Sequence, residues 1–173
     1  MPGVIHSSMG PGVGVVRKDR SSLGQELRLY PGVDFQICIM TYYSVEVRFQ
    51  DLDAFGHVNN AIFLTYCEQA RVRYYDSLFP LKSALDFPFL IVHAELDYKK
   101  PVVITDEIEM GIGVGRIGKA SWDFIYEARN RISQDVHCTA RTVQAYWDHE
   151  KKSTAPIHTD LRHKLEAAQQ PGA

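Results

Sequence analysis

The chain has 173 residues, of which 45% are hydrophobic and 23% are charged, and its formal net charge is -2 at pH 7. This length suits one domain, with or without a tail, and the composition excludes wholesale disorder; the near-neutral charge provides no general basic field for nucleic acid or a membrane surface. Three cysteines without a C-x-x-C pair argue against a disulfide scaffold or a zinc site and favour the cytoplasm, and no apolar run approaches the ~20 residues of a membrane span.

The first 40 residues differ in composition from the rest of the chain. They contain six of the 12 glycines, and residues 1–32 show no clean hydrophobic periodicity. We therefore predict that residues 1–40 form a flexible N-terminal extension, and that a chain starting at Met40 folds without it. Residues 33–39 are apolar enough to form a strand that lengthens the element after them.

The next segment alternates as a strand does. Val45, Val47 and Phe49 are separated from one another by polar residues, which is the period of a half-buried strand. Residues 51–60 then form a polar stretch rich in turn-forming residues. We expect the chain to pass there from the strand into a helix.

Residues 61–78 predict one long helix. They contain neither glycine nor proline, and their apolar residues recur at helical spacing. Asn59 or Asn60 is the expected N-cap, and Pro80 is expected to end the helix. The apolar stripe comprises Phe63, Cys67, Ala70, Tyr74 and Leu78, whereas Glu68, Gln69, Arg71 and Arg73 supply much of the polar surface.

Four more strands and a short helix complete the pattern. Short turns at residues 116–118 and 130–133 indicate antiparallel hairpins. A short helix is expected from Leu161 to Ala168. The predicted strands cover residues 90–97, 107–114, 120–127 and 136–147, so the chain divides into an extension (1–40), one domain (41–160) and a C-terminal helix and tail (161–173).

The order of strand, long helix and four strands predicts an α+β fold. An antiparallel five-stranded sheet wrapped around the one long helix would bury the apolar stripe of that helix. One face and one edge of such a sheet stay partly uncovered. We therefore expect the sheet to pair with a second copy of the chain.

Residues 51–60 are the richest in candidate chemistry. Two acids, a histidine and two asparagines lie where a strand gives way to a helix. A helix N-terminus presents free N–H groups that polarise a carbonyl, and a nearby carboxylate can serve as a general base or a nucleophile. The same residue types are also common in turns and helix caps, so composition leaves both interpretations open.

The motif at this position resembles that of a known family. Residues 47–60, followed by Glu68-Gln69-Ala70-Arg71, resemble the opening of the hotdog-fold acyl-CoA thioesterases of the 4-hydroxybenzoyl-CoA thioesterase type. The family pattern is D-x-D-x-x-G-H-V-N-N, then a helix carrying E-x-A-R. The resemblance covers residues 43–150, with later matches in the family's order at residues 96–101, 106–107 and 118–121.

The resemblance implies roles for the residues of the motif. The family's catalytic carboxylate falls on Asp53, which would activate a water molecule or attack the thioester carbon itself. Gly56 would supply the turn. The backbone amides that would face the thioester oxygen belong to Val58, Asn59 and Asn60.

The histidine at the position of His57 is used differently by different members of the family. Related plant acyl-carrier-protein thioesterases carry a D-x-N-x-H motif in which the asparagine and histidine assist catalysis. Here Phe55 stands in place of that asparagine, while His57 is kept. Both a supporting role in catalysis and a role as a loop residue stay open for His57.

The family also suggests where the substrate lies. The acyl group would occupy a channel between the helix and a partner subunit, and the coenzyme A phosphates would meet basic residues at strand ends and turns. The expected acyl-pocket residues are Phe63, Tyr66 and Ala94, and the expected coenzyme A contacts are Lys99, Lys100, Arg116 and Lys119.

We therefore predict hydrolysis of an acyl-CoA thioester to a carboxylic acid and coenzyme A by a cytoplasmic homodimer or homotetramer. No cofactor, metal, nucleic acid or membrane is expected. The alternatives are a thioesterase for acyl-carrier protein, a hotdog hydratase or dehydratase, and a non-catalytic acyl-CoA-binding module. A G-x-G-x-x-G match at residues 113–118 lacks the helix that a dinucleotide site needs, and a calcium-loop match from Asp51 has Ile62 where a carboxylate is required.

Overall fold

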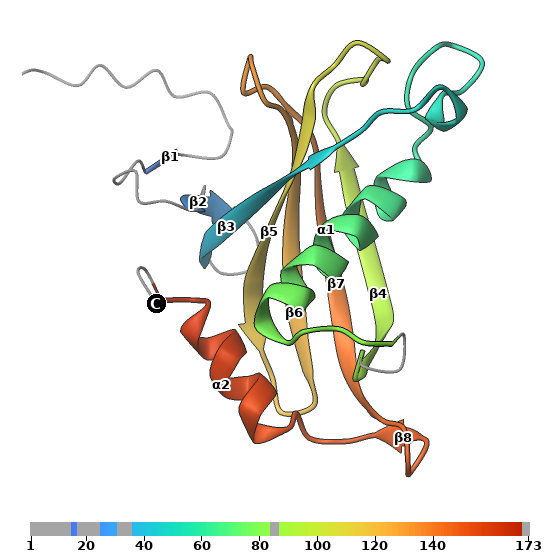
Figure 1. The fold of residues 1–173 in the computed structure, drawn as a ribbon. Coiled ribbons are helices and arrows are strands. Elements are labelled where there is room, and N and C mark those ends of the chain that lie inside the picture. Colours follow the sequence, from blue (N-terminus) through green and yellow to red (C-terminus); the bar gives the residue numbers. More distant parts are fainter. Residues whose placement is uncertain (1–14, 17–24, 31–35, 84–86, 171–173) are drawn as a thin grey trace, which may run out of the picture.

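The computed structural model describes residues 15–16, 25–30, 36–83 and 87–170. Its main body is one antiparallel sheet with a long helix, α1, lying across one face (Figure 1). The helices are α1 (Ile62–Leu78) and α2 (Thr159–Ala167), with a 3-10 turn η1 (Phe49–Asp51); the strands are β1 (Val15–Val16), β2 (Gln25–Tyr30), β3 (Gln36–Val45), β4 (Phe89–Tyr98), β5 (Ile108–Ile117), β6 (Ser121–Asn130), β7 (Val136–Asp148) and β8 (Ser153–Thr154).

The strand order confirms the predicted fold. Seven strands follow the order β1-β2-β3-β5-β6-β7-β4, β8 pairs with β7, and every pair is antiparallel. The central five, β3-β5-β6-β7-β4, form the predicted five-stranded sheet, although β3 lies before the strand predicted at residues 45–49. In the described part of the chain, the strands β1, β2 and β8 are present in addition to these five.

The core lies between α1 and the inner face of the sheet. Alternate residues of β6, Trp122, Phe124 and Tyr126, are each 0% exposed beneath the helix. The Tyr74 ring of α1 meets the Phe124 ring edge-on at 5.7 Å between centroids. Burying one such side chain stabilises the fold by about 1.5–3 kcal/mol. Arg71, which the sequence places on the polar face of the helix, is buried instead, and this prediction is therefore wrong.

The predicted strand at residues 45–49 is also wrong. β3 ends at Val45, and Phe49 begins the η1 turn with 85% of its surface exposed. The cause is local: the Arg48 backbone N–H donates to Asp51 Oδ2 at 3.0 Å. A side chain that bonds its own nearby backbone competes with a strand ladder, so alternation alone did not decide the conformation.

The sheet extends beyond the predicted N-terminal boundary. Residue 40 lies inside β3, and β2 pairs with β3 over its whole length. The prediction of a flexible extension is therefore wrong for residues 25–30 and 36–40. The rest of the predicted extension, except the two residues of β1, lies outside the described residues.

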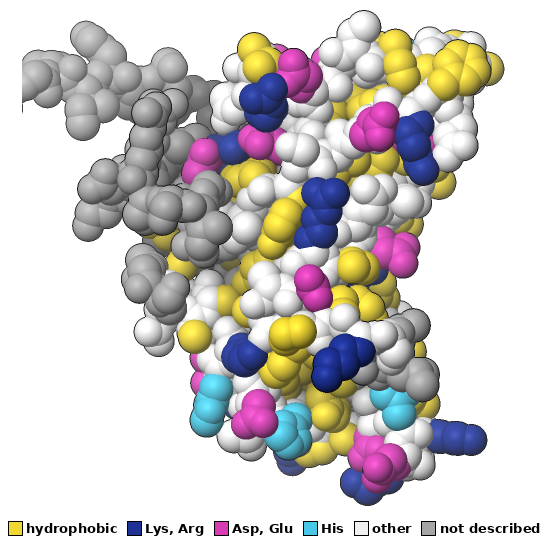
Figure 2. All heavy atoms as spheres, viewed as in Figure 1, with side chains coloured by type: hydrophobic (Ala, Val, Ile, Leu, Met, Phe, Trp, Pro, Cys, Tyr) yellow, Lys and Arg dark blue, Asp and Glu magenta, His cyan; other side chains and the backbone are white. Residues whose placement is uncertain are grey.

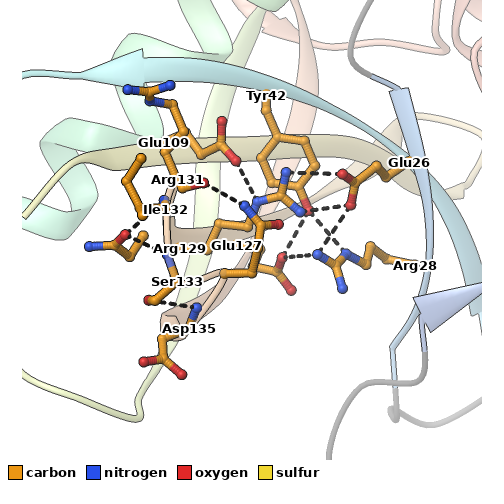
Figure 3. Close-up of polar contacts among 12 residues, drawn as sticks. Glu26, Arg28, Tyr42, Glu109, Glu127, Arg129, Arg131, Ile132, Ser133 and Asp135 are labelled. Atoms are coloured by element: carbon orange, nitrogen blue, oxygen red, sulfur yellow. Dashed lines mark hydrogen bonds and ion pairs between the residues drawn. The ribbon is translucent and has the colours of Figure 1, made fainter. Parts of the chain in front are cut away.

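A cluster of charged side chains, of which Arg28, Glu127 and Arg129 are buried, joins β2 to the sheet on the face away from α1 (Figure 3). Arg28 Nη2 lies 3.3 Å from Glu127 Oε1, which also accepts a 2.8 Å hydrogen bond from the Tyr42 hydroxyl. Arg129 Nη1 lies 2.7 Å from Glu26 Oε2, and the Arg129 guanidinium stacks 3.4 Å above the Tyr42 ring. We call this set the outer-face cluster; it comprises Glu26, Arg28, Tyr42, Glu109, Glu127 and Arg129.

Because the strands are antiparallel, the loops that connect them lie at two opposite ends of the sheet, which we call the proximal and the distal end. At the proximal end β4 finishes and α1 begins, and the Tyr98 hydroxyl donates to the Asn60 carbonyl at 2.9 Å. The loop between β3 and α1, coloured cyan in Figure 1, lies at this end. At the distal end β4 begins, α1 finishes and β5 turns into β6. Paired residues mark the proximal end at Tyr98–Cys138 and Ile108–Asn130, and the distal end at Leu90–Ala145 and Ile117–Trp122.

The surface carries both signs of charge. On the face shown in Figure 2, acidic and basic side chains are interspersed, with no large area of one sign. This agrees with a net charge of -2. Within the described ranges, no helix has the length and hydropathy needed to cross a membrane.

Candidate active site

A tight loop between η1 and α1 carries most of the predicted site. Isolated β-bridges join Leu52 to Val58 and His57 to Val103, which fixes the loop against the segment after β4. The Gly56 N–H donates to the Asp53 carbonyl at 3.1 Å, and Gly56 has a φ of +76°. A side chain at this φ would be strained, so glycine is the residue that this turn requires.

Asp53 lies inside this loop, and its two carboxylate oxygens differ. Oδ1 accepts backbone N–H groups from Phe55 at 2.8 Å and from His57 at 3.2 Å. Oδ2 has no hydrogen-bond partner among the described residues. The side chain is half-buried. One oxygen is thus fixed by the turn, while the other can contact a water molecule or a substrate.

The amides predicted to face the substrate are not all available. The Val58 N–H donates to the Val102 carbonyl at 2.8 Å, and the Asn59 N–H donates to the Asp51 carbonyl at 2.8 Å. Both amides are therefore used inside the protein, and their prediction as oxyanion donors is wrong. The Asn60 N–H has no hydrogen-bond partner in the part of the chain that the structure describes.

The start of α1 differs from the expected cap. Ala61 is the N-cap, and its side chain offers no hydrogen-bond acceptor. Asn59 instead uses its Oδ1 to accept the Ala61 N–H at 2.9 Å, and its carbonyl accepts the Ile62 N–H at 2.9 Å. Asn59 thus closes the turn just before the helix and accepts the amides of both Ala61 and Ile62.

Asp51, the other acid of the motif, is a structural anchor. It is 1% exposed; its Oδ1 accepts from Arg48 Nη2 at 2.8 Å, and its Oδ2 accepts from the Tyr66 hydroxyl at 2.9 Å. Burial acts to raise the pKa of Asp51, but the hydrogen bonds from Arg48 and Tyr66 outweigh it, and the pKa is lowered from its ordinary value. Asp51 therefore holds the loop onto α1 as a carboxylate.

The predicted acyl-pocket residues fall into two groups. Phe63 is 3% exposed and Tyr66 is 0% exposed, and the Phe63 ring packs edge-on against the Tyr98 ring at 5.5 Å. Within one chain these two residues form core rather than pocket wall. Ala94 is exposed; its register partner Thr142 pairs in turn with the core residue Phe124, which places Ala94 on the inner side of β4. Tyr98, which the sequence analysis did not single out, is signalled only by its place in the 96–101 match.

The predicted coenzyme A contacts are divided between the two ends of the sheet. Lys99 and Lys100 follow β4 at the proximal end, and Lys100 Nζ lies 2.8 Å from Asp135 Oδ1. Arg116 is near the end of β5, and Lys119 is in the turn after it, at the distal end. One chain therefore does not bring the four basic side chains together.

Two other features lie apart from the loop. In the described residues, no group of three or more His, Cys, Asp or Glu side chains is close enough to hold a metal ion. A cavity of about 670 Å³ lies between β3, the end of α1 and α2, where Tyr43, Tyr74 and Ala168 are among its lining residues. None of its lining residues belongs to the predicted site.

Comparisons with known proteins show which proteins this chain resembles. The family model described as the thioesterase-like superfamily matches residues 47–165. A 1,4-dihydroxy-2-naphthoyl-CoA hydrolase of Nostoc punctiforme is 35% identical over 131 residues, which is 72% of this chain and 85% of the relative. The long-chain acyl-CoA thioesterase FadM of Escherichia coli is 27% identical over 131 residues, covering 70% of this chain and 94% of FadM.

A solved structure gives the same result. A thioesterase from Thermus thermophilus, determined with coenzyme A and zinc, superposes with a TM-score of 0.68 and 29% sequence identity. The match covers 75% of this chain and 95% of the other. The matched residues therefore make up nearly all of the Thermus thermophilus protein, whereas about a quarter of this chain lies outside the match.

Proposed function

Because this chain belongs to the thioesterase-like superfamily, we propose that it hydrolyses an acyl-CoA thioester to a carboxylic acid and coenzyme A. Asp53 is the catalytic carboxylate in this proposal. Both curated relatives described above are named for the hydrolysis of coenzyme A thioesters. Their different acyl groups leave the acyl group of this chain's substrate open.

The observation that carries the proposal is the asymmetry of Asp53. A turn aspartate needs one oxygen for the backbone, and here Oδ1 accepts both the Phe55 and the His57 amides. This arrangement limits the rotation of the carboxylate and leaves Oδ2 for chemistry. Oδ2 can either remove a proton from the attacking water or attack the thioester carbon directly.

The start of α1 supports the other requirement of the attack, which is a hydrogen-bond donor for the thioester oxygen. Attack on a thioester places negative charge on the carbonyl oxygen, and a preorganised N–H donor stabilises that charge. The Asn60 N–H is available among the described residues, and the N-terminus of the 17-residue helix adds about half a positive charge. We assign the oxyanion contact to Asn60, not to Val58 or Asn59, because those two amides already have partners.

The test is release of free thiol from a panel of acyl-CoAs by the purified chain and by Asp53→Asn. Asparagine keeps an oxygen for the Phe55 and His57 amides, so the turn should persist. We expect kcat to fall by about 10²–10⁴-fold, the usual range for a general base, with acyl-CoA binding retained. A near-normal kcat in Asp53→Asn would overturn the assignment.

Asp148→Asn is the matched control. Asp148 Oδ1 also accepts two backbone amides, those of Glu150 and Lys151, each at 3.0 Å, in a turn at the distal end of the sheet. If both aspartates served only their turns, the two variants would lose equal activity. Wild-type protein that binds acyl-CoAs without releasing thiol would support the binding-module alternative.

A further inference from the structure

Three arginine side chains are buried in the described residues, and one of them differs from the other two. Arg28 and Arg129 are 5% and 4% exposed, and each is neutralised by glutamates of the outer-face cluster. Arg71 is 7% exposed, yet no carboxylate within the described ranges forms an ion pair with it. A buried guanidinium without an anionic partner is unfavourable, because it has lost water and gained no counter-charge.

The single hydrogen bond of Arg71 leads into a chain of neutral polar groups. Arg71 Nη1 donates to the Tyr126 hydroxyl at 3.2 Å, and that hydroxyl lies 3.2 Å from Thr142 Oγ1. Gln144 Nε2 donates to the same Thr142 oxygen. Gln144 Oε1 is enclosed and has no partner in the described part of the protein. The one partner of Arg71 in the described residues is therefore a neutral hydroxyl, which does not neutralise the cation.

The other Arg71 nitrogens border accessible space. They have no hydrogen-bond partner among the described residues, but they are not among the fully enclosed polar atoms. Thr142, next in the polar chain, is the register partner of Ala94 on the inner side of β4. Ala94 is exposed and is the predicted acyl-pocket residue that one chain leaves open. Thr142, in the middle of the polar chain, therefore lies beside the expected path of the acyl group.

We propose that Arg71 binds a hydrogen-bond-accepting oxygen group, preferably a carboxylate, carried on the acyl part of the substrate. The inference rests on the proposed thioester hydrolysis and names its substrate class: acyl-CoAs whose acyl group is polar or acidic away from the thioester. The substrate then supplies the counter-charge that the folded chain lacks. Arg71 acts here in substrate selection and takes no part in bond cleavage.

The position of Arg71 on α1 determines where the oxygen group of the acyl chain would bind. Arg71 is eleven residues after Asn60, so their Cα atoms are about 16 Å apart along a helix axis. Arginine side chains in helices lean toward the N-terminus, which shortens the span to the guanidinium. The acceptor therefore belongs at the far end of the acyl group.

The test compares acyl-CoAs of equal carbon number that end in a methyl group, a hydroxyl or a carboxylate. For the wild type, we expect kcat/KM to be on the order of tenfold or more higher for the carboxylate form than for the methyl form, because a site built for a polar group discriminates against analogues that lack it. Arg71→Met should reduce this ratio to near one, and Arg71→Lys should restore part of it. Arg73→Met is the matched control; Arg73 lies on the same helix, is exposed and donates to the Ser44 carbonyl, and its loss should leave the ratio unchanged.

Several results would overturn the inference. They are a wild-type ratio near one, an unchanged ratio in Arg71→Met, or a shift of Arg71→Met from dimer to monomer, which would assign the counter-charge to a second copy. If Arg71→Met does not fold, the wild-type ratio and Arg71→Lys still decide. If no acyl-CoA releases thiol, the proposed function fails, and equilibrium binding of the same matched acyl-CoAs to the wild type and Arg71→Lys judges the inference separately.

Discussion

Asp51 and Asp53 are two residues apart, yet their carboxylates are held in opposite ways. Asp51 is enclosed, with its oxygens bonded to Arg48 and Tyr66, whereas Asp53 keeps one oxygen free of protein partners in the described region. A carboxylate that is fully hydrogen-bonded and buried is a poor base, because protonation would break its bonds. Of the two aspartates in the motif, Asp51 therefore holds the loop in place, and Asp53 is the one proposed to act in catalysis.

The lowered pKa of Asp51 predicts a dependence of stability on pH. The Asp51 carboxylate binds a proton less readily in the folded state than in the unfolded chain. Its contribution to the free energy of unfolding is therefore complete above the unfolded pKa of about 3.9. It is lost as the pH falls through the lower pKa of the folded state. We expect Asp51→Asn to lower the free energy of unfolding by about 1–3 kcal/mol at neutral pH, and the difference from the wild type to disappear in acid, as measured by urea unfolding from pH 7 to pH 2.

Asp97→Asn is the control for this measurement. Asp97 is 77% exposed at the side chain and lies 3.9 Å from Lys99 Nζ. Exposed ion pairs contribute little to stability. A difference between Asp51→Asn and the wild type that persisted undiminished at the lowest pH would contradict the role assigned to Asp51.

Some residue roles could be predicted from the sequence and others could not. The composition of residues 51–60 indicated a turn before a helix, and the resemblance of the motif to the family pattern then implied the roles of Asp53 and Gly56. The amide of Val58 bonds to Val102, more than forty residues away, and no local pattern reports such a partner. Arg71 was assigned to the polar face because charge usually means exposure; only the packing of α1 on β6 shows that it is buried.

Among the described residues, the strand β2 is the longest element that was not predicted from the sequence. Glu26-Leu27-Arg28-Leu29 does alternate polar and apolar residues, but its neighbours are rich in glycine and the run is short. The alternation also suggests that the charged side chains face water. In the structure Arg28 is buried against Glu127, so partners more than eighty residues apart determine this strand. The long helix and the later strands were predictable because their apolar period repeats over enough residues.

The outer-face cluster predicts that β2 stabilises the fold. Removing one partner from a buried ion pair leaves an uncompensated charge, which costs about 3–5 kcal/mol. We expect Arg28→Ala to lower the free energy of unfolding by this amount, because Glu127 is 0% exposed. A chain starting at Met40 lacks β2 and should lose comparable stability, contrary to the expectation from sequence.

Arg131→Ala is the matched control for Arg28→Ala. Arg131 also pairs with a glutamate, Glu107, but both side chains are more than half exposed. Its removal should change the free energy of unfolding by less than about 1 kcal/mol. Equal effects of the two substitutions in chemical denaturation would show that the outer-face cluster does not stabilise the sheet.

At the scale of the whole molecule, β4 is an uncovered edge. It pairs with β7 on one side, and its other side has no strand partner among the described residues. Leu90, Ile91 and Val92 on it are 46%, 46% and 61% exposed. Long apolar edge strands invite pairing with another chain. We therefore expect two copies to join β4 to β4 in an antiparallel arrangement.

Such a dimer would also reunite the predicted coenzyme A contacts. Antiparallel pairing places the distal end of one sheet beside the proximal end of the other. Lys99 and Lys100 of one copy would then approach the end that holds Arg116 and Lys119 of the second copy. The two pairs of basic residues lie at opposite ends of one sheet, and a site formed between two chains would bring them together.

Val92→Lys tests this arrangement. A charge on the β4 edge should disfavour pairing, shift the mass measured by light scattering toward the monomer, and lower thiol release as the protein is diluted. Ile132→Lys, in the β6–β7 turn where the side chain is 68% exposed, is the control and should leave the mass unchanged. A wild-type protein that is fully active as a monomer would rule out the shared site.

The strand order has a consequence for a chain that is still being synthesised. β3 joins β5 at Thr41–Ile112, and β4 joins β7 at Leu96–Ala140, so both edges of the central sheet pair with strands that emerge much later. Closing such long loops is slow. The apolar β4 strand therefore leaves the ribosome before β7 exists. Aggregation during translation, more than unfolding of the finished protein, is the hazard that this topology creates, and folding chaperones are expected to act on the nascent chain between the emergence of β4 and that of β7.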